Sequence, residues 1–365
     1  MSAQDSMPDV PLDVIRADIR ALHAYPVAPG TGLVKLDLME NPYTLPTELA
    51  RELGVRLGAL ALNRYPPGDP AEFKRRLGAW AGLPAGSALL LGNGSDELIH
   101  LLILACAGPE TVVLAPWPSF SMYRLIAAQD RCRFVDVPLR PDFTLDLPAF
   151  LAAMAEHRPA VVFLAYPNNP TGNCFDPADI AAILDAAPGL VVVDEAYLPF
   201  AGRTWIAELP RQPRLLVLRT LSKLGLAGVR LGYLCGAPEL VAQLDKVRPP
   251  FNVNVLTLAA VDFLLGHAAL LDGQAAAIRA DRDRLIARLR DLAATVPGMA
   301  VFDSAANFFL LRVADAPGVF AALLQQGILV KDVSASHPLL RGCLRVTVGT
   351  GEENERFLQA LQASI

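Results

Sequence analysis

Seven short apolar runs between residues 88 and 236 alternate with segments whose apolar residues recur at helical spacing. This alternation predicts an α/β fold, with a mainly parallel central sheet that carries helices on both faces. One helix is expected over 177–187, where Ile180, Ile183 and Leu184 form an apolar stripe. The strands are expected at residues 88–91, 111–115, 133–137, 160–165, 190–194, 215–219 and 231–235.

The rest of the chain predicts a smaller domain of the α+β type. The pair Pro249-Pro250 breaks the alternating pattern, and a long helical region follows. Shorter strands are expected at 308–313 and 343–348, and we expect the amino-terminal segment to cross back to them. The predicted division is a large cofactor-binding domain over residues 45–260, and a small domain formed by residues 1–44 and 261–365.

Asp194 and Lys223 each stand at or just beyond the end of a predicted buried strand. Open α/β sheets bind ligands at the carboxyl ends of their strands, so the carboxylate and the lysine are expected in one site. Taken alone, Lys223 reads as a surface lysine and Asp194 as a helix cap. Together they are the pair that pyridoxal phosphate requires, a lysine that forms a Schiff base and an acid that keeps the ring nitrogen protonated.

A glycine turn, Gly92 to Asp96, lies between the strand at 88–91 and an apolar helix. The free N–H groups at such a helix start bind anions, and Ser95 adds a hydroxyl group. We therefore expect Gly94, Ser95 and Asp96 to bind the cofactor phosphate, with Arg230 close enough to share it. The turn lacks the third glycine of a dinucleotide fingerprint, which disfavours nicotinamide binding.

These motifs carry a resemblance to a known family. The segments LGNGSDELI, YPNNPTG, VVDEAY, RTLSK and GLAGVRLGY resemble the fold-type I pyridoxal-phosphate aminotransferases. With the segments KLDLMENPY and CLRVTVGTGEENE, the chain is most similar to the histidinol-phosphate aminotransferase family. The resemblance extends from about residue 25 to residue 357 and implies a fold-type I transferase with a large and a small domain.

The resemblance implies a role for most of these residues. Lys223 would hold the cofactor as a Schiff base and act as general base and acid in a ping-pong mechanism. Asn169 and Tyr197 would hold the phenolate oxygen. Phe120 stands where the family often stacks a tyrosine on the ring. Trp117 and Tyr123 are expected to be packing residues, with a place close to the ring as the alternative for Tyr123. The expected phosphate ligands are Gly94, Ser95, Asp96, Ser222, Arg230 and, from the neighbouring subunit of a homodimer, Tyr65.

The implied substrates are histidinol phosphate with imidazole acetol phosphate, and glutamate with 2-oxoglutarate. Arg345 begins an apolar run, so it is either half of a structural ion pair or a fork for a substrate carboxylate, and the resemblance favours the fork. Lys331 stands where a second arginine is often found, and Pro67 where an aspartate is usual. The loop from Lys223 to Arg230 is one residue shorter than is common. The predicted substrate-binding residues are Tyr25, Asn41, Lys331 and Arg345.

Three alternatives are weighed against this function. An aromatic amino acid aminotransferase and a threonine-phosphate decarboxylase share the fold, and a half-reaction assay separates them from the first hypothesis. A cofactor-binding regulator without turnover is disfavoured, because such proteins usually carry a DNA-binding domain and we expect no room for one before Tyr25.

Composition narrows the remaining classes of protein. The net charge of −5, without basic clusters, disfavours nucleic acid as a partner. No apolar stretch reaches the roughly 18 to 20 residues of a membrane span, and residues 1–13 lack a secretory signal. The five scattered cysteines and five dispersed histidines predict free thiols and no metal site, in a cytoplasmic protein.

Overall fold

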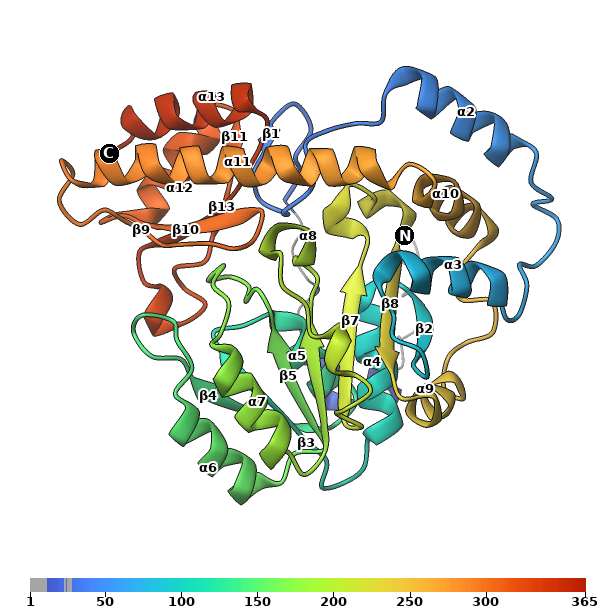
Figure 1. Cartoon of the computed structure of the whole chain (residues 1–365). Helices are drawn as coiled ribbons and strands as arrows, with labels where there is room; N and C mark the ends of the chain where they lie inside the picture. Colours follow the sequence, from blue (N-terminus) through green and yellow to red (C-terminus); the bar gives the residue numbers. More distant parts are fainter. Residues whose placement is uncertain (1–11, 23, 25–27) are drawn as a thin grey trace, which may run out of the picture. The chain divides into compact units, whose positions relative to one another are not determined.

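The computed structural model describes residues 12–22, 24 and 28–365, and the chain divides into two units between Thr31 and Gly32 (Figure 1). In the described part of the first unit there are a 3-10 helix, η1 (Leu12–Val14), and a short α-helix, α1 (Ala17–Arg20). All other elements belong to the second unit. Tyr25, which we expected to bind substrate, lies outside the described residues.

A seven-stranded sheet forms the centre of the second unit, in the order β2-β8-β7-β6-β5-β3-β4. β8 runs antiparallel to both of its neighbours, and the pairs from β7 to β4 are parallel. The seven predicted strands are therefore confirmed, as is the mainly parallel sheet. The strands are β2 (Ala88–Asn93), β3 (Val112–Trp117), β4 (Arg133–Pro138), β5 (Val161–Ala165), β6 (Leu190–Asp194), β7 (Leu215–Thr220) and β8 (Leu231–Gly236).

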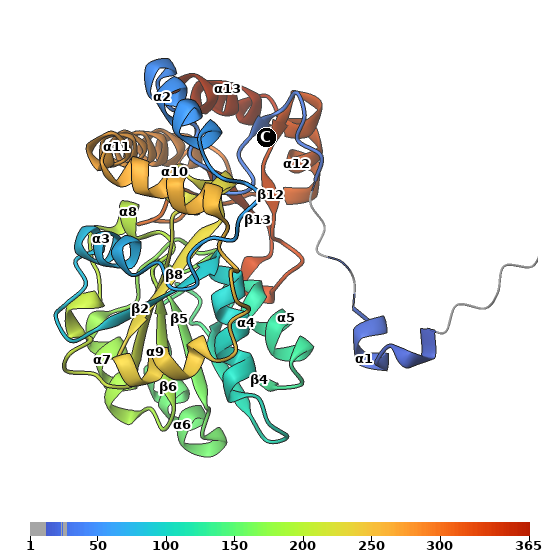
Figure 2. The ribbon, with the colours of Figure 1, turned by 90° about the vertical axis from the view of Figure 1, so that its right-hand side faces the viewer.

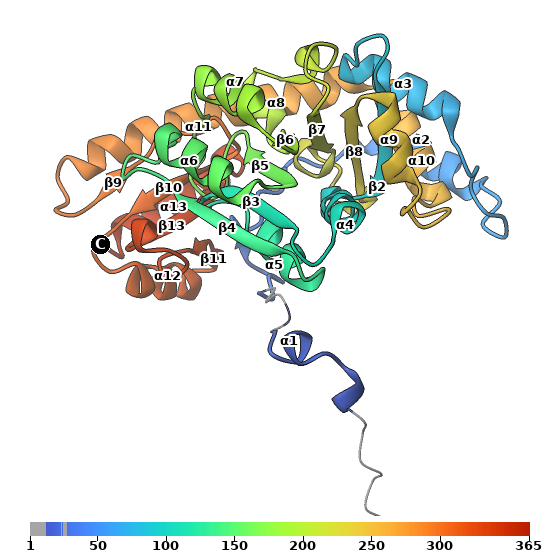
Figure 3. The same cartoon turned by 90° about the horizontal axis from the view of Figure 1, so that it is seen from below.

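Helices cover both faces of this sheet, because alternate strand residues point into two different cores. On one face Val192 packs in a core with residues of α4 (Ser95–Cys106), α5 (Ser121–Gln129) and α9 (Pro238–Asp245). On the other face Val191 and Val193 pack in a core that includes α6 (Leu147–His157) and α7 (Pro177–Ala186). Figure 3 shows α6 and α7 on one side of the sheet, with α4 and α5 on the other. The predicted helix over 177–187 is thus confirmed.

A second sheet of four antiparallel strands, in the order β12-β13-β10-β9, lies in the carboxy-terminal third. Its strands are β9 (Ala300–Val301), β10 (Phe308–Arg312), β12 (Lys331–Asp332) and β13 (Cys343–Thr347). The helices α11 (Ala268–Ala293), α12 (Ala316–Gln325) and α13 (Gly351–Gln362) accompany it. β1 (Val34–Lys35) pairs in parallel with β11 (Ile328–Leu329), so the amino-terminal segment does reach this part of the chain. The domain boundaries at residues 45 and 260 stay a prediction.

The parallel strands point toward α8 (Leu198–Ala201) and α11 in Figure 1. In Figure 2, α2 (Thr47–Gly58), α10 (Val255–Leu265) and α11 gather at that end. No single helix in the described part is long and apolar enough to cross a membrane; α10 and α11, bent by 80°, meet the length and composition criteria only together. The remaining helices are α2 (Thr47–Gly58), α3 (Ala71–Ala81), α8 (Leu198–Ala201), α10 (Val255–Leu265), η2 (Ile206–Glu208), η3 (Ser222–Leu224), η4 (Ala227–Val229) and η5 (Pro338–Leu340).

Candidate active site

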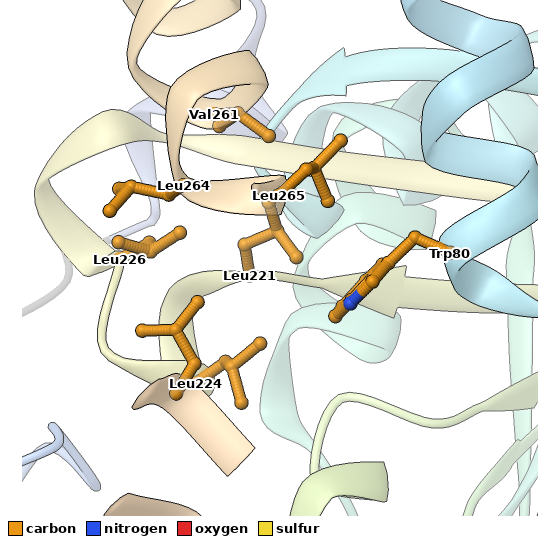
Figure 4. A pocket seen from close by; sticks show the side chains of 8 residues that line it. Trp80, Leu221, Leu224, Leu226, Val261, Leu264 and Leu265 are labelled. Atoms are coloured by element: carbon orange, nitrogen blue, oxygen red, sulfur yellow. The ribbon is translucent and has the colours of Figure 1, made fainter. Parts of the chain in front are cut away.

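Lys223 stands on a short turn that leaves the end of β7. The turn forms the 3-10 helix η3, and its apolar neighbours Leu221, Leu224 and Leu226 are buried. Figure 4 shows these three leucines around a pocket that Trp80 of α3 and Leu264 of α10 also line. Burial of apolar side chains on both sides of the lysine anchors the turn. The sequence therefore fixes the position of Lys223 through its leucine neighbours.

The ammonium group of Lys223 lies inside the site. Its Nζ donates to the carbonyl oxygen of Leu38 at 3.0 Å, and no salt bridge to a carboxylate is found for it among the described residues. Although the side chain is partly accessible to solvent, burial lowers the pKa of Lys223 to about 8, and the positive charge of Arg345 acts in the same direction. A lysine whose pKa is lowered toward neutrality is a candidate nucleophile and general base.

Asp194 is the last residue of β6, and its carboxylate is buried. Its Oδ1 accepts a hydrogen bond from the backbone N–H of Ala196 at 3.0 Å, and its Oδ2 accepts one from the hydroxyl group of Tyr123 at 2.7 Å. Burial raises the pKa of Asp194 to about 6, although both hydrogen bonds act against the increase. A buried acid held by two donors presents a fixed carboxylate to any group in the site.

The glycine turn forms a tight cradle at the start of α4. Gly94 has φ of +83°, and a Cβ there would lie 2.5 Å from Nη2 of Arg230. A Cβ at Gly232, on the neighbouring strand β8, would meet the backbone of Gly94 at 2.6 Å and the nitrogen of Ser95 at 2.7 Å. Only residues without side chains allow this approach. The N–H groups of the first helical turn and the Arg230 guanidinium therefore lie together, as an anion requires.

Arg230 reaches the cradle despite the shortened loop. It adopts the left-handed conformation, with φ of +55°, between η4 and β8. Ser222 lies at the start of η3, where its hydroxyl group is 2.9 Å from that of Thr220. Asp96, in the first turn of α4, has a raised pKa because burial outweighs the nearby charges of Arg230 and Lys223. Arg230 supplies positive charge and Ser222 a hydroxyl group on the side of the site where the helix begins, and the carboxyl group of Asp96 lies near Arg230.

Asn169 connects two other predicted site residues. Its Nδ2 donates to the hydroxyl oxygen of Tyr197 at 3.2 Å, and its Oδ1 accepts from Nη1 of Arg345 at 2.6 Å. Arg345 also donates from Nη2 to the carbonyl oxygen of Asp37 at 2.7 Å. Asn169 and Tyr197 are both buried, so these bonds fix the direction in which the amide presents its N–H groups.

Lys331 lies directly opposite Arg345 in the antiparallel pair of β12 and β13. Side chains opposite each other in such a pair project from the same face of the sheet. Two cationic side chains are therefore presented together, one buried and one half-buried. Both were predicted to bind substrate, but the sequence did not show that they lie opposite each other on paired strands.

Three other predicted residues, Asn41, Phe120 and Tyr65, differ in what they contact. Asn41 donates to the carbonyl oxygen of Leu224 at 3.3 Å, so it contacts the turn that carries the lysine. Phe120 caps α5 and meets the ring of Tyr123 edge-on, at 5.4 Å between centroids. Tyr65 is 81% exposed and stacks on Phe251, at 4.7 Å between ring centroids. Within one chain, Tyr65 is thus a surface residue.

Tyr123 is the residue whose bond to the site the sequence did not predict. We expected a packing residue, and the ring does pack in the core against Phe163, at 4.5 Å between centroids. Its hydroxyl group, however, bonds to the acid at the centre of the site. The one available signal was that a buried tyrosine hydroxyl needs a partner. The carbonyl oxygen of Leu38, which holds Lys223, gave no sequence signal at all.

The residues present fit pyridoxal phosphate. Glycines at 94 and 232 bring the Arg230 guanidinium and the N–H groups at the start of α4 together, as a phosphate requires, and Lys223 is a desolvated amine that can react with an aldehyde. Asp194 is a fixed carboxylate for a ring nitrogen, and Asn169 offers its amide for an oxygen substituent. By contrast, no group of three or more metal-ligating side chains occurs in the described ranges, and the five cysteines are all free.

The fold and this site define a transferase of the aminotransferase type, and comparison with known proteins agrees. The family described as "Aminotransferase class I and II" matches residues 33–361. The chain belongs to this family, whose members depend on pyridoxal phosphate.

Similar proteins within this family are named histidinol-phosphate aminotransferases. The chain is 56% identical to "Histidinol-phosphate aminotransferase 1" of Ralstonia nicotianae, covering 99% of this chain and 97% of that protein. It is 54% identical to the protein of the same name from Burkholderia lata, covering 97% and 99%. The structure of the histidinol-phosphate aminotransferase from Sinorhizobium meliloti, in complex with pyridoxal-5'-phosphate, has a TM-score of 0.82 at 23% identity and covers 95% of this chain and 97% of that one. At that identity the likeness concerns the fold.

Proposed function

We propose that the chain is a histidinol-phosphate aminotransferase of histidine biosynthesis. It would transfer the amino group of histidinol phosphate to 2-oxoglutarate, giving imidazole acetol phosphate and glutamate. The proposal is supported by the curated relatives at 53% to 56% identity over almost the whole chain. The structural observation that carries it is the juxtaposition of Arg345 and Lys331, two cations suited to substrates with different anions.

Pyridoxal phosphate, when bound, supplies an electron sink for the carbanion that forms when the substrate loses its α-proton. Gly94, Ser95 and Asp96 would hold its phosphate with backbone N–H groups, with help from Ser222 and Arg230. Asp194 would hold the ring nitrogen, and Asn169 with Tyr197 would hold the ring's oxygen substituent. Phe120 would cover one face of the ring.

Lys223 is the residue that moves the proton. With a pKa near 8, a larger fraction of Lys223 is unprotonated at neutral pH than of an exposed lysine, so more of it is available as a general base. The carbonyl oxygen of Leu38 limits the positions that Nζ can take. We infer that Lys223 removes the α-proton from one substrate and returns a proton in the second half of the reaction.

Arg345 and Lys331 would bind the anionic ends of the substrates. The planar guanidinium of Arg345 suits a carboxylate, and Asn169 and the carbonyl of Asp37 hold it in place. The Lys331 ammonium is a flexible point charge that can follow a phosphate. Asn41 contacts the turn that carries Lys223 and is a candidate substrate ligand. Tyr25 keeps this role as a prediction.

We infer that the protein acts as a homodimer in the cytoplasm. The support is indirect, since Tyr65 is exposed and its ring stacks on Phe251 at the surface of its own chain. In a dimer its hydroxyl group would reach the phosphate in the neighbouring subunit. Small-molecule substrates are what an aminotransferase requires, and neither nucleic acid nor a membrane enters the proposal.

The decisive experiment compares amino donors in single turnovers of the cofactor-loaded protein. Histidinol phosphate, an aromatic amino acid and threonine phosphate are each mixed with the enzyme, and the cofactor spectrum is followed with and without 2-oxoglutarate. We expect the fastest amino transfer from histidinol phosphate. A faster reaction with the aromatic amino acid, or release of carbon dioxide from threonine phosphate, would favour one of the two alternatives on the same fold.

A further inference from the structure

Tyr123 and Asp194 form a buried pair behind the cofactor site. The hydroxyl group of Tyr123 donates to Oδ2 of Asp194 at 2.7 Å, and the tyrosine side chain is completely buried. Charge-assisted bonds of this length are the stronger ones in proteins, and low polarity around the pair strengthens them further. The bond therefore stabilises the ionised form of Asp194, and the tyrosine ring packs in the core as well.

The fold aims the two residues at each other. Asp194 follows Val192 by two positions on β6, so its side chain points to the face of the sheet where α4 and α5 lie. Tyr123 stands in the first turn of α5, on that same face. Its ring is stacked on Phe163 of β5, with an interplanar angle of 11°. Because the ring is fixed by this contact, the position of the hydroxyl group is fixed with it.

We propose that Tyr123 is a positioning residue that keeps Asp194 ionised, so that the shared proton resides on the ring nitrogen of the bound cofactor. The inference rests on the cofactor assignment made above. It goes beyond that assignment, because it says that Tyr123 keeps the proton on the ring nitrogen and off Asp194. The hydroxyl group of Tyr123 would act through its bond to Asp194.

The surroundings of Asp194 explain why a donor is needed. Burial raises the pKa of this carboxyl group, and the negative charges of Asp96 and Glu195 add to the increase. The hydroxyl of Tyr123 and the N–H of Ala196 act in the opposite direction. If the hydroxyl is removed, Asp194 becomes the stronger base and takes the proton from the ring nitrogen. A neutral ring accepts electrons less well, so the loss would reach catalysis through the acid.

Tyr123 also contacts the residue expected to cover the ring. Its edge meets Phe120 with an interplanar angle of 86°. Substitution to phenylalanine keeps this contact and the stacking on Phe163, and it removes only the hydroxyl group. Tyr123→Phe therefore separates the effect on the acid from the effect on packing.

The test uses the holoenzyme loaded with pyridoxal phosphate that carries ¹⁵N in its ring. The ¹⁵N chemical shift reports whether the ring nitrogen is protonated, independently of turnover. We expect Tyr123→Phe to lower the ratio of protonated to neutral ring by about tenfold or more, the effect of losing one hydrogen bond to a charged group. The dissociation constant of the cofactor should rise by a similar factor, measured by titration of the apoprotein.

Tyr233→Phe is the matched control. Tyr233 is an equally buried tyrosine whose hydroxyl group bonds to Arg219, away from Asp194. It should leave the ¹⁵N shift unchanged, even where it lowers the melting temperature. If Tyr123→Phe also leaves the shift unchanged, Tyr123 is a packing residue and the proposal is wrong.

A second variant covers the case in which Tyr123→Phe is unstable. 3-Fluorotyrosine at position 123 is nearly isosteric and is a stronger donor, so the protonated ring should gain population relative to the parent. No gain would contradict the proposal. A parent protein that binds no pyridoxal phosphate at all would instead overturn the proposed function, so the two failures are distinguishable.

Discussion

Replacing Lys223 with methionine should make the apoprotein more stable at neutral pH. The packing around Lys223 lowers its pKa from 10.5 to about 8. The Lys223 side chain therefore binds a proton more weakly in the folded chain than in the unfolded chain. At about 1.4 kcal/mol per unit of pKa, this difference destabilises the folded apoprotein by at most about 3 kcal/mol at pH 7. The hydrogen bond to Leu38 returns about 1 kcal/mol, so methionine should gain about 1 to 2 kcal/mol.

The dependence on pH has a definite sign. Below pH 8 both the folded and the unfolded chain carry the proton, and the cost of the buried charge is present in full. Between pH 8 and about 10.5 the unfolded chain binds more protons than the folded one, so stability of the parent rises with pH. Above about 10.5 neither state is charged at this position. The advantage of Lys223→Met should therefore be largest below pH 8 and disappear as the pH approaches 10.5.

The assay is urea unfolding of the two apoproteins at a series of pH values. Lys246→Met is the control, because Lys246 is an exposed lysine on the surface of the same chain. It should show neither the gain nor its dependence on pH. Equal stability of Lys223→Met and the parent at pH 7, or a difference that does not change up to pH 10.5, would refute the conclusion that the ammonium of Lys223 is held in a poorly solvated place.

Three further outcomes are expected. Asp194→Asn should bind the cofactor and lose most of its turnover, as measured by steady-state rates, because an amide cannot stabilise a positively charged ring; rates near the parental value would remove Asp194 from the mechanism. Mixing inactive Lys223→Ala with inactive Tyr65→Phe should restore part of the activity through hybrid dimers, and no recovery after verified subunit exchange would mean that each site is built from one chain. Arg345→Lys should slow the glutamate half-reaction by roughly tenfold, whereas Lys331→Ala should chiefly weaken histidinol phosphate; equal losses in both half-reactions would contradict this division.

Much of the fold could be predicted because its signals are local. Each strand of the central sheet is a run of apolar residues such as 190–193, bounded by polar residues, and periodicity alone locates it. The strand ends are less certain: β3 continues to Trp117, two residues beyond the prediction, because its pairing with β4 continues that far. The antiparallel direction of β8 was likewise outside the reach of a local pattern.

Site residues that belong to sequence motifs could be predicted. Contacts between residues that are distant in the sequence could not. Lys223, Asp194 and Arg230 stand beside recognisable turns, and the structure brings their segments to one end of the sheet. The bond that Arg345 donates to Asn169 joins residues that are 176 positions apart. The bond from Tyr123 to Asp194 joins residues that are 71 apart. No pattern in one sequence encodes such a pairing, because it depends on the stacking of helices and strands.

The two cores on either side of the sheet have a consequence for insertions and deletions. Asp194 points toward Tyr123 because it has the same parity along β6 as Val192, whereas Val191 and Val193 point the other way. Removing a single residue from β6 would turn the acid toward the opposite core, however favourable its own hydrogen bonds are. Side chains in the loop from Lys223 to Arg230 do not alternate between two faces. The loop is one residue shorter than is common, and the long, flexible Arg230 side chain still reaches Gly94. Changes of length are therefore expected to accumulate among relatives in this loop and to be absent from the strand.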